Sequence, residues 1–363
     1  MTFEEARAQF PVLERFAYLN AGTFGPLARS TAEALDRCRR RDLEEGRSGA
    51  GYWEGLMEAR DRLRAQIGEM LGVPPDTVAL TGSTTDGCNV VVGGLGLAPE
   101  DEVVTTDVEH PGLLGPLEAS GARVRVARVK ERPADEALDA IRAEVTPRTR
   151  LLALSHVAWS TGNVLPVAEL KEETGLPVLV DGAQSVGAIP VDASTVDYYT
   201  VSGQKWLCGP EGTGALYVAD PEGLRVAAPT SFGFVHDDDP SLRPKPGAAR
   251  FDTSWVGPGQ AAGLEAALAT APDWRFERAL EQAARARERL AERVEVVTAP
   301  RQATLVAFRV DGDTAEAAKR LFAEGVVVRD IPGRGWLRAS VGWWTSDEDV
   351  ERLVAALQEV LTE

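Results

Sequence analysis

Short apolar runs alternate with segments of helical spacing along most of the chain. The apolar runs have the length and composition of buried strands, and they lie at residues 78–80, 101–106, 123–129, 150–155, 178–180, 198–201 and 215–218. Helical spacing marks residues 30–46, 53–71 and 135–145. Strands that alternate with helices predict a mostly parallel sheet with right-handed crossovers. We therefore expect an α/β fold with helices flanking the sheet.

The last third of the chain has a pattern of its own. Helices are expected from about Pro258 and, with an amphipathic face, at residues 274–294. Further strands are predicted at 304–308, 326–329 and 336–341, and further helices at 314–324 and 347–361. Ser346 and Asp349 have the spacing of a capping box for the final helix. These elements predict a second, smaller α/β unit.

A chain of 363 residues is too long for one ordinary core. We expect a separate N-terminal segment at residues 1–25. A large domain is expected at residues 26–272 and a small C-terminal domain at residues 273–363.

Composition narrows the classes of partner. The formal net charge is -17, whereas nucleic acids and anionic membranes bind positive surfaces, so we expect neither as a partner. No apolar run reaches membrane-spanning length, and the first residues lack the pattern of a signal peptide. Three dispersed cysteines, Cys38, Cys88 and Cys208, form neither a disulfide framework nor a metal motif. We expect a cytoplasmic protein without a metal site.

The stretch 178–218 carries the most specific chemical signal. Its first apolar run ends at Asp181, and its second delivers Ser202, Gly203, Gln204 and Lys205. Two strand ends in one sheet bring a carboxylate and an amine to the edge where α/β sheets bind ligands. Pyridoxal phosphate (PLP) chemistry requires this pair, since a lysine holds the cofactor as a Schiff base and a carboxylate keeps the ring nitrogen protonated. The alternative is a surface lysine and a helix-capping aspartate.

This stretch resembles the class V aminotransferase and cysteine desulfurase family. The residues that match the family pattern are Asp181, Gln184, Ser202, Gly203, Lys205, Gly209, Pro210 and Gly212, whereas Gln204 stands where many members have His. The resemblance implies a fold type I PLP-dependent transferase in which residues 26–272 bind the cofactor. It implies catalytic roles for Lys205 and Asp181, and cofactor contacts from Gln184, Ser202 and Gln204.

Two further segments are candidates for cofactor contacts. Residues 81–87, rich in hydroxyl groups, lead from a strand into a helix, an arrangement that suits a phosphate as well as a plain helix cap. The family has a phosphate-binding loop here, which implies Thr84 and Thr85 as ligands. His110 follows Glu109, and in the family this histidine stacks on the pyridine ring and can shuttle protons; a lone histidine is otherwise most often structural.

The substrate side is expected to come from both ends of the chain. In the family a Tyr-Leu-Asn stretch near the N-terminus lines the active site, which implies Asn20, Gly22 and Thr23 as substrate contacts. Arg338, in the sequence Arg-Ala-Ser, matches the arginine that binds the substrate carboxylate, with Arg329 as its neighbour. The resemblance also implies a homodimer with active sites at the subunit interface, where Thr253 and Ser254 stand in place of a Gly-Thr element.

The loop at residues 330–336 separates the possible reactions. Cysteine desulfurases carry their persulfide-forming cysteine there, and this loop has none. Trp159 and Ser160 resemble instead the subgroup of isopenicillin N epimerase-like proteins and cysteine/cystine C–S lyases. We therefore expect β-elimination at a sulfur-containing amino acid. Epimerisation, transamination and desulfuration remain alternatives, as does a PLP-binding protein without enzymatic activity. Trp159, Trp255, Trp336 and Trp343 are each compatible with a pocket wall or with core.

Overall fold

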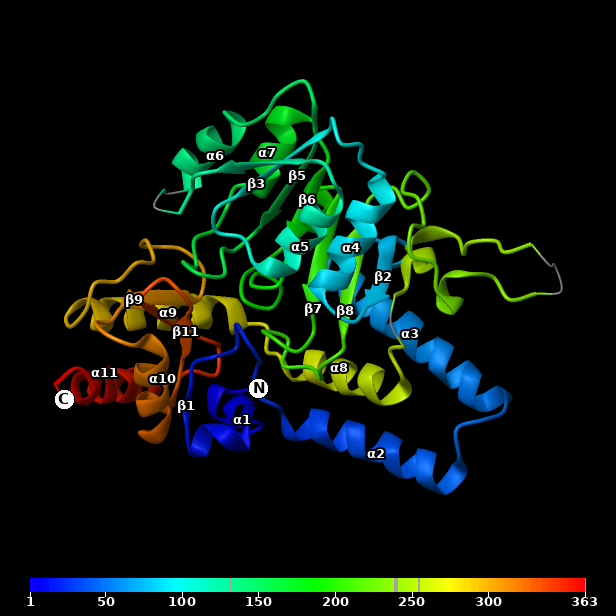
Figure 1. Ribbon diagram of the computed structural model, residues 1–363. Helices are drawn as coiled ribbons and strands as arrows, with labels where there is room; N and C mark the ends of the chain where they lie inside the picture. The colour runs from blue at the N-terminus through cyan, green and yellow to red at the C-terminus, as the bar shows by residue number, and fades with distance from the viewer. Residues whose placement is uncertain (131, 133, 238–240, 254, 363) are drawn as a thin grey trace.

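A computed structural model describes residues 1–363 except 131, 133, 238–240, 254 and 363. A seven-stranded sheet forms the centre of the larger part (Figure 1), in the order β2-β8-β7-β6-β5-β3-β4. β8 pairs antiparallel with both β2 and β7, and the other neighbours are parallel. This confirms the mostly parallel sheet. The seven strands are β2 (Val78–Thr81), β3 (Glu102–Thr106), β4 (Arg123–Ala127), β5 (Thr149–Ser155), β6 (Val178–Asp181), β7 (Tyr198–Ser202) and β8 (Gly214–Val218).

Alternate residues of the strands pack into two cores, one on each face of the sheet. Leu80, Val104, Leu154 and Val180 belong to one cluster, while the neighbouring Ala79, Val103, Ala153 and Leu179 belong to the other. Both faces are therefore apolar, which explains why these strands are continuous apolar runs in the sequence. The helices of this part are α2 (Arg29–Glu45), α3 (Ala50–Leu71), α4 (Thr84–Leu95), α5 (Pro111–Ala119), α6 (Ala134–Arg142), α7 (Val167–Thr174) and α8 (Pro258–Thr270).

The smaller part lies beside the large sheet, and its strands β11 and β12 approach the carboxyl ends of β6 and β7. It contains an antiparallel sheet of its own, in the order β11-β12-β9 (Figure 1). Its elements are β9 (Leu305–Arg309), β10 (Val326–Val327), β11 (Arg329–Ile331) and β12 (Trp336–Ser340), with α9 (Arg275–Ala291), α10 (Thr314–Ala323) and α11 (Asp347–Thr362). The capping box is present, since the Ser346 hydroxyl accepts from Asp349 N and the Asp349 carboxylate accepts from Ser346 N. α1 (Phe3–Arg7), like α5 and α7, is a helix that the spacing did not predict.

The N-terminal segment joins this smaller part. β1 (Ala17–Tyr18) pairs in parallel with β10, and Leu19 O accepts from Ser340 N at 2.7 Å. Ala17 and Leu19 lie in the same core as α10 and α11. The single strand predicted at 326–329 is divided, because Val326 and Val327 pair with β1 whereas Arg329 begins the pairing with β12.

A buried ion cluster ties α3 to the segment before α8. Asp252 accepts hydrogen bonds from Arg60 at 2.8 Å and from Arg64 at 3.0 Å, and it also accepts from Leu80 N at 2.8 Å. Asp252 and Arg60 are 1% and 2% exposed. Because Leu80 lies one residue before the end of β2, this cluster fixes the edge of the sheet from which the loop to α4 departs.

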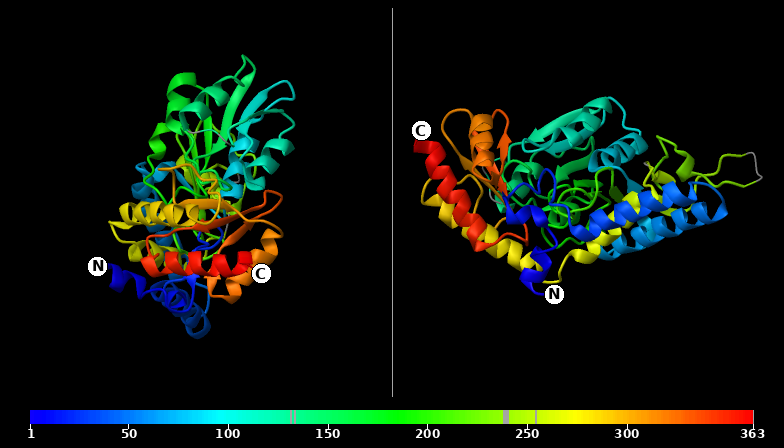
Figure 2. Two further views of the ribbon diagram at one scale, coloured as in Figure 1. Left: turned by 90° about the vertical axis from the view of Figure 1, so that its left-hand side faces the viewer. Right: turned by 90° about the horizontal axis from the view of Figure 1, so that it is seen from below.

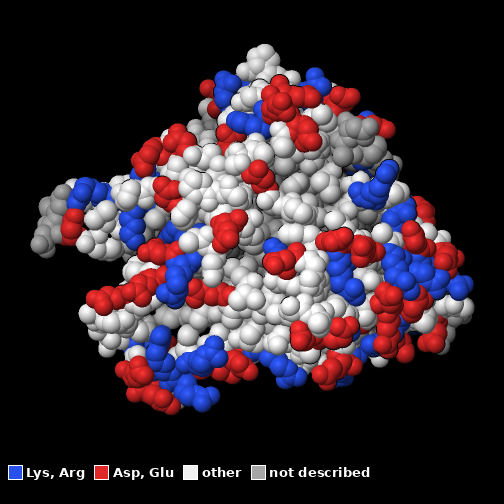
Figure 3. All heavy atoms as spheres, turned by 180° about the vertical axis from the view of Figure 1, so that it is seen from behind, with Lys and Arg blue, Asp and Glu red and all other residues white. Residues whose placement is uncertain are grey.

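The outside of the molecule is charged and mixed. Figure 3 shows acidic and basic side chains interspersed over one face. Figure 2 shows α2 and α3 extending away from the smaller part, and α8 packs against both. Among the described residues, no helix combines the length and the apolar character needed to cross a membrane.

Candidate active site

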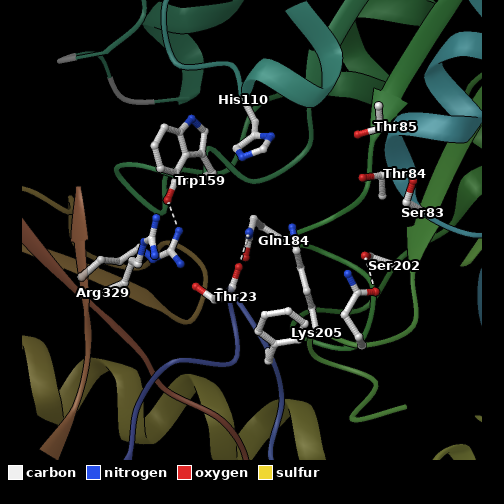
Figure 4. A pocket seen from close by; sticks show the side chains of 14 residues that line it. Thr23, Ser83, Thr84, Thr85, His110, Trp159, Gln184, Ser202, Lys205 and Arg329 are labelled. Carbon is white, nitrogen blue, oxygen red and sulfur yellow. Dashed lines mark hydrogen bonds between the residues drawn. The ribbon is translucent and has the colours of Figure 1, made fainter. Parts of the chain in front are cut away.

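A pocket of about 270 Å³ opens where the carboxyl ends of β6 and β7 approach β11 and β12. Side chains from the N-terminal segment, the large sheet and the small sheet point toward it (Figure 4). It is lined by Gly22, Thr23, Phe24, Ser83, Thr84, Thr85, His110, Trp159, Gln184, Ser202, Gln204, Lys205, Arg329 and Arg338. Of the residues predicted from the sequence, only Asn20 and Asp181 do not line it.

Two adjacent parallel strands deliver the carboxylate and the amine. Asp181 is the last residue of β6, and Lys205 follows the end of β7. Burial, partly offset by Asp181, lowers the pKa of Lys205 to about 8. Asp181 is 3% exposed and accepts from Ala183 N at 3.0 Å, so its carboxylate lies at the base of the site. Lys205 therefore exists as the uncharged, nucleophilic amine at a lower pH than an ordinary lysine does.

The start of α4 offers hydrogen-bond donors to an anion. Ser83 caps the helix and accepts from Asp86 N at 3.1 Å, while Thr84 and Thr85 occupy the first turn and line the pocket. On the same side of the pocket (Figure 4), the Ser202 hydroxyl donates to Gln204 Oε1 at 3.0 Å. Unpaired N–H groups of the first turn and nearby hydroxyls are the usual ligands of a phosphate.

His110 and Trp159 form one aromatic wall. Their ring centroids are 5.3 Å apart and the rings are perpendicular. His110 Nδ1 accepts from Gly112 N at 3.0 Å, which places the histidine at the N-cap of α5. Burial, followed by the charge of Lys205, lowers the pKa of His110. The imidazole is thus neutral at physiological pH.

Gly22 is the point where the N-terminal segment meets the substrate side. Its carbonyl accepts from Gln184 Nε2 at 2.9 Å, and Gln184 Oε1 accepts from Trp206 Nε1 at 3.0 Å. A Cβ at Gly22 would lie 2.7 Å from Arg338 Nη2 and 2.9 Å from Ser340 Oγ. Asn20 does not line the pocket but holds a residue that does, because its Oδ1 accepts from the Thr23 hydroxyl at 2.9 Å.

Arg338 is a buried cation with unused hydrogen-bonding capacity. Its Nη1 donates to Trp159 O at 2.5 Å, whereas its Nε and the nearby Ser340 Oγ are buried without a partner among the described residues. Burial, with a smaller effect of Arg329, lowers the pKa of Arg338 to about 9. Buried polar atoms without partners are rare. Arg338 lines the pocket beside Gly22, and its free guanidinium donors suit the two oxygens of a carboxylate.

The four tryptophans considered from the sequence have different environments. Trp159 lines the pocket, Trp336 and Trp343 are buried at 2% and 4% exposure, and Trp255 is half exposed. Of the segment expected at the subunit interface, Thr253 N donates to Leu80 O at 3.1 Å, and Ser254 lies outside the described residues.

The sequence did not single out Phe24 or Ser83 as lining residues. Ser83 precedes Thr84 in the hydroxyl-rich loop, and its position as the N-cap of the following helix could have identified it as a lining residue. Phe24 follows Thr23, but a partly exposed aromatic side chain in a turn carries no pattern that marks a binding site.

All three cysteines lie among the described residues, and none lines the pocket. Cys88 is buried in α4, and Cys208 is buried with its thiol donating to Trp206 O at 3.8 Å. Burial raises the pKa of both thiols. Neither thiol is therefore a ready nucleophile.

Comparisons with known proteins show which family the chain is similar to. The sequence model of the aminotransferase class-V family matches residues 45–353. The chain is 32% identical to isopenicillin N epimerase of Amycolatopsis lactamdurans, over 98% of this chain and 98% of that protein. It is 34% identical to a probable cysteine desulfurase of Mycolicibacterium paratuberculosis, over 75% of this chain and 43% of that protein.

Solved structures extend the comparison. The cystine C-S lyase C-DES, in complex with its reaction product cysteine persulfide, matches with a TM-score of 0.90 and 28% identity, over 96% of this chain and 99% of that one. A C-DES mutant with glycine covalently linked to its PLP cofactor matches with a TM-score of 0.89 and 29% identity, over 97% of this chain and 98% of that one.

Proposed function

The chain belongs to the class V aminotransferase family of PLP-dependent enzymes, and we propose that its reaction is β-elimination at a sulfur-containing amino acid, as in a cystine C–S lyase. The observation that carries the proposal is the position of the thiols. A desulfurase needs a cysteine over the reacting sulfur, and no cysteine lines this pocket.

The residues of the pocket fit PLP. The first turn of α4, with Ser83, Thr84 and Thr85, and the hydroxyl of Ser202 offer donors to a phosphate dianion. The amine of Lys205, which loses its proton more readily than an ordinary lysine, suits an aldehyde, and the buried carboxylate of Asp181 suits a protonated ring nitrogen. The edge of the sheet thus offers a suitable group for each part of the cofactor, from the pocket lining and from Asp181 next to it.

Each side chain then has one task. Lys205 would hold the aldehyde group of the cofactor and would accept the Cα proton of the substrate. Asp181 would keep the ring nitrogen protonated. His110 and Trp159 would pack against the cofactor, and Gln184, Gln204 and Thr23 would orient the cofactor and the substrate. When bound, PLP supplies an electron sink for the pair left by the Cα proton.

Arg338 holds the substrate α-carboxylate beside Gly22, which fixes the position of Cα next to Lys205. The Cβ–S bond then breaks, and its electron pair leaves with the sulfur. After hydrolysis the products are pyruvate, ammonia and a thiol or persulfide. No oxidant is needed, because the electrons stay with the leaving group.

A second arginine favours a substrate with a second carboxylate. Arg329 lines the same pocket, and its nearest carboxylate is that of the adjacent Asp330, at 3.8 Å. That separation exceeds hydrogen-bonding distance. Cystine carries two carboxylates, and the structural neighbour C-DES is a cystine C-S lyase.

The test is to incubate purified holoenzyme with cystine, cysteine and sulfur-free amino acids, and to measure pyruvate, alanine and keto acids. We expect pyruvate from cystine and none from sulfur-free amino acids. Alkylation of accessible thiols, with a Cys38→Ser variant as the control, should leave the rate unchanged. Alanine and persulfide in place of pyruvate would establish a desulfurase, and keto acids from ordinary amino acids an aminotransferase.

Epimerisation is the second candidate, and the 32% identity to isopenicillin N epimerase over nearly the whole chain favours it. Lys205 and the neutral His110 line the same pocket and both can carry a proton. Deuterium uptake at Cα of isopenicillin N in heavy water, with inversion and without pyruvate, would replace the lyase by an epimerase.

We propose that the enzyme acts as a cytoplasmic homodimer. Trp53 and Trp255 are 49% and 52% exposed and contact each other with ring centroids 5.8 Å apart. An exposed aromatic cluster of this kind is typical of an interaction surface. Sedimentation of wild type and of Trp53→Glu measures the oligomeric state. We expect a dimeric wild type and a weakened dimer in the variant, and a monomeric wild type would contradict the proposal.

A further inference from the structure

Glu109 is a buried carboxyl that no part of the reaction above uses. It is 6% exposed and precedes His110 in the loop between β3 and α5. One oxygen accepts from the Thr106 hydroxyl; the other accepts from Ser155 N at 2.9 Å and from the Ser155 hydroxyl at 2.5 Å. Among the described residues, no lysine or arginine forms an ion pair with it. Glu109 is therefore held by neutral donors.

Its nearest charged neighbour has the same sign. Ser155, which supplies two of these hydrogen bonds, lies directly opposite Asp181 in the register of β5 and β6. Adjacent strands are about 4.8 Å apart. Both carboxyls also act on the thiol of Cys88, whose pKa burial and these two charges raise. Glu109 and Asp181 thus share one buried region at the carboxyl edge of the sheet.

We propose that Glu109 is a positioning residue for Asp181, a second carboxyl whose ionisation sets the negative charge beneath the cofactor ring. The inference rests on the PLP site proposed above and does not depend on which bond the enzyme breaks. When Glu109 is neutral, Asp181 alone opposes the positive ring nitrogen. When Glu109 is ionised, two charges do, and the nitrogen holds its proton more firmly.

Neither the thiol of Cys88 nor the imidazole of His110, which lie beside Glu109, changes charge near neutrality. Burial, partly offset by the hydrogen bonds from Ser155 and Thr106 and assisted by Asp181, raises the pKa of Glu109 to about 7. Cys88, from α4, has a raised pKa and stays a neutral thiol, while His110, on the same loop, has a lowered pKa and stays a neutral imidazole. Asp181 comes from β6. Two buried carboxyls without a cation between them do not both ionise easily.

Glu109→Gln is the direct test, because the amide keeps the shape and the hydrogen bonds of the neutral acid. Glu102→Gln is the matched control. Glu102 is likewise buried, at the start of β3, but Thr146 and Arg148 hold its pKa below the usual value. The visible absorption of holoenzyme is titrated from about pH 5.5 to 8.5. We expect a pH-dependent component in wild type and in Glu102→Gln, with a midpoint below that of Glu109 in apoenzyme because the positive ring nitrogen favours the ionised carboxylate, and its loss in Glu109→Gln.

Ser155→Ala supplies an independent variant, since loss of one donor to the carboxylate moves that midpoint to higher pH. Apoenzyme melting supplies a readout without cofactor: the melting temperature of wild type should fall relative to Glu109→Gln as pH rises from about 5 to 8. The same spectral component in Glu109→Gln, or parallel melting curves, would overturn the proposal. A protein without any cofactor band would instead contradict the PLP site, and the melting curves would still test Glu109.

Discussion

Arg329 and Arg338 lie directly opposite each other across the antiparallel strands β11 and β12. Like charges at directly opposed positions destabilise a sheet, and here one of the two is fully buried. The cost is relieved when anions enter the pocket. The pair therefore indicates a site that is completed by its substrate.

The first prediction separates the two arginines. Arg338→Lys should lower kcat/KM for cystine and for cysteine alike, because both have an α-carboxylate. Arg329→Gln should lower it for cystine more than for cysteine. A charge-assisted hydrogen bond contributes about 1.5–3 kcal/mol, or roughly 10- to 150-fold. Steady-state kinetics of both variants with both substrates measure the difference; equal losses from Arg329→Gln would remove its assignment to the second carboxylate.

The second prediction concerns Gly22. In Gly22→Ala the new Cβ would lie 2.7 Å from Arg338 Nη2 and 2.9 Å from Gln184 Oε1. The arginine must move, so KM should rise at least about tenfold while the fold is retained. Gly115→Ala is the control: nothing lies within 4 Å of its Cβ position in α5. That variant should gain about 0.4–1 kcal/mol of stability with unchanged KM. An unchanged KM in Gly22→Ala would show that the arginine does not depend on this contact.

The third prediction follows from the pKa of about 8 for Lys205. Only the free amine attacks an aldehyde, so covalent capture of PLP by apoenzyme should rise with pH through a midpoint near 8. Stopped-flow absorbance measures this rate. Lys171→Ala, which removes a lysine paired with Asp197 at 2.9 Å, should behave as wild type. A midpoint near 10 would mean that burial does not affect the amine.

The same shift has a consequence for stability. The folded protein binds this proton less tightly than the unfolded chain, so apoenzyme stability should rise as pH rises from about 8 to 10.5. Lys205→Met should lack that part of the increase. Chemical denaturation of apoenzyme at several pH values tests the sign.

The fourth prediction concerns the buried cluster of Asp252, Arg60 and Arg64. Asp252→Asn leaves two buried guanidinium groups without their carboxylate and should cost about 3–5 kcal/mol in the free energy of unfolding. Glu265→Gln removes the partner of Arg62, whose side chain is 56% exposed, and should cost about 0–1 kcal/mol. Urea unfolding compares the two, and similar losses would show that burial does not control the strength of these pairs.

The parts of this site that were predictable depend on local pattern. Asp181 and Lys205 each follow an apolar run, and a run predicts a buried strand whose end faces the ligand edge. The hydroxyl-rich loop before α4 was visible for the same reason. Arg338 and His110 were identified through the family resemblance, since a single arginine in a strand or a single histidine in a loop has no distinctive spacing.

Other features depend on contacts between distant residues. Arg329 faces Arg338 only because β11 and β12 pair in one register, and the predicted strand at 326–329 did not contain the change of partner at Val328. Glu109 is significant because Ser155 of another strand binds it. Asp252 and its arginines are about 190 positions apart, as the separations of 188 and 192 residues show. A pattern of neighbouring residues does not reveal pairs that are so far apart in the sequence.

The pairing of β1 with β10, and of Leu19 with Ser340, has a consequence for how the protein is made. Residues 17–18 form a two-stranded sheet with β10, which is synthesised more than 300 residues later. Contacts of such separation form slowly, and until they form Gly22 has no arginine beside it. A nascent chain can therefore form the strands of its large sheet before the proposed substrate site exists, because that site also requires residues 17–22 to meet residues 326–340.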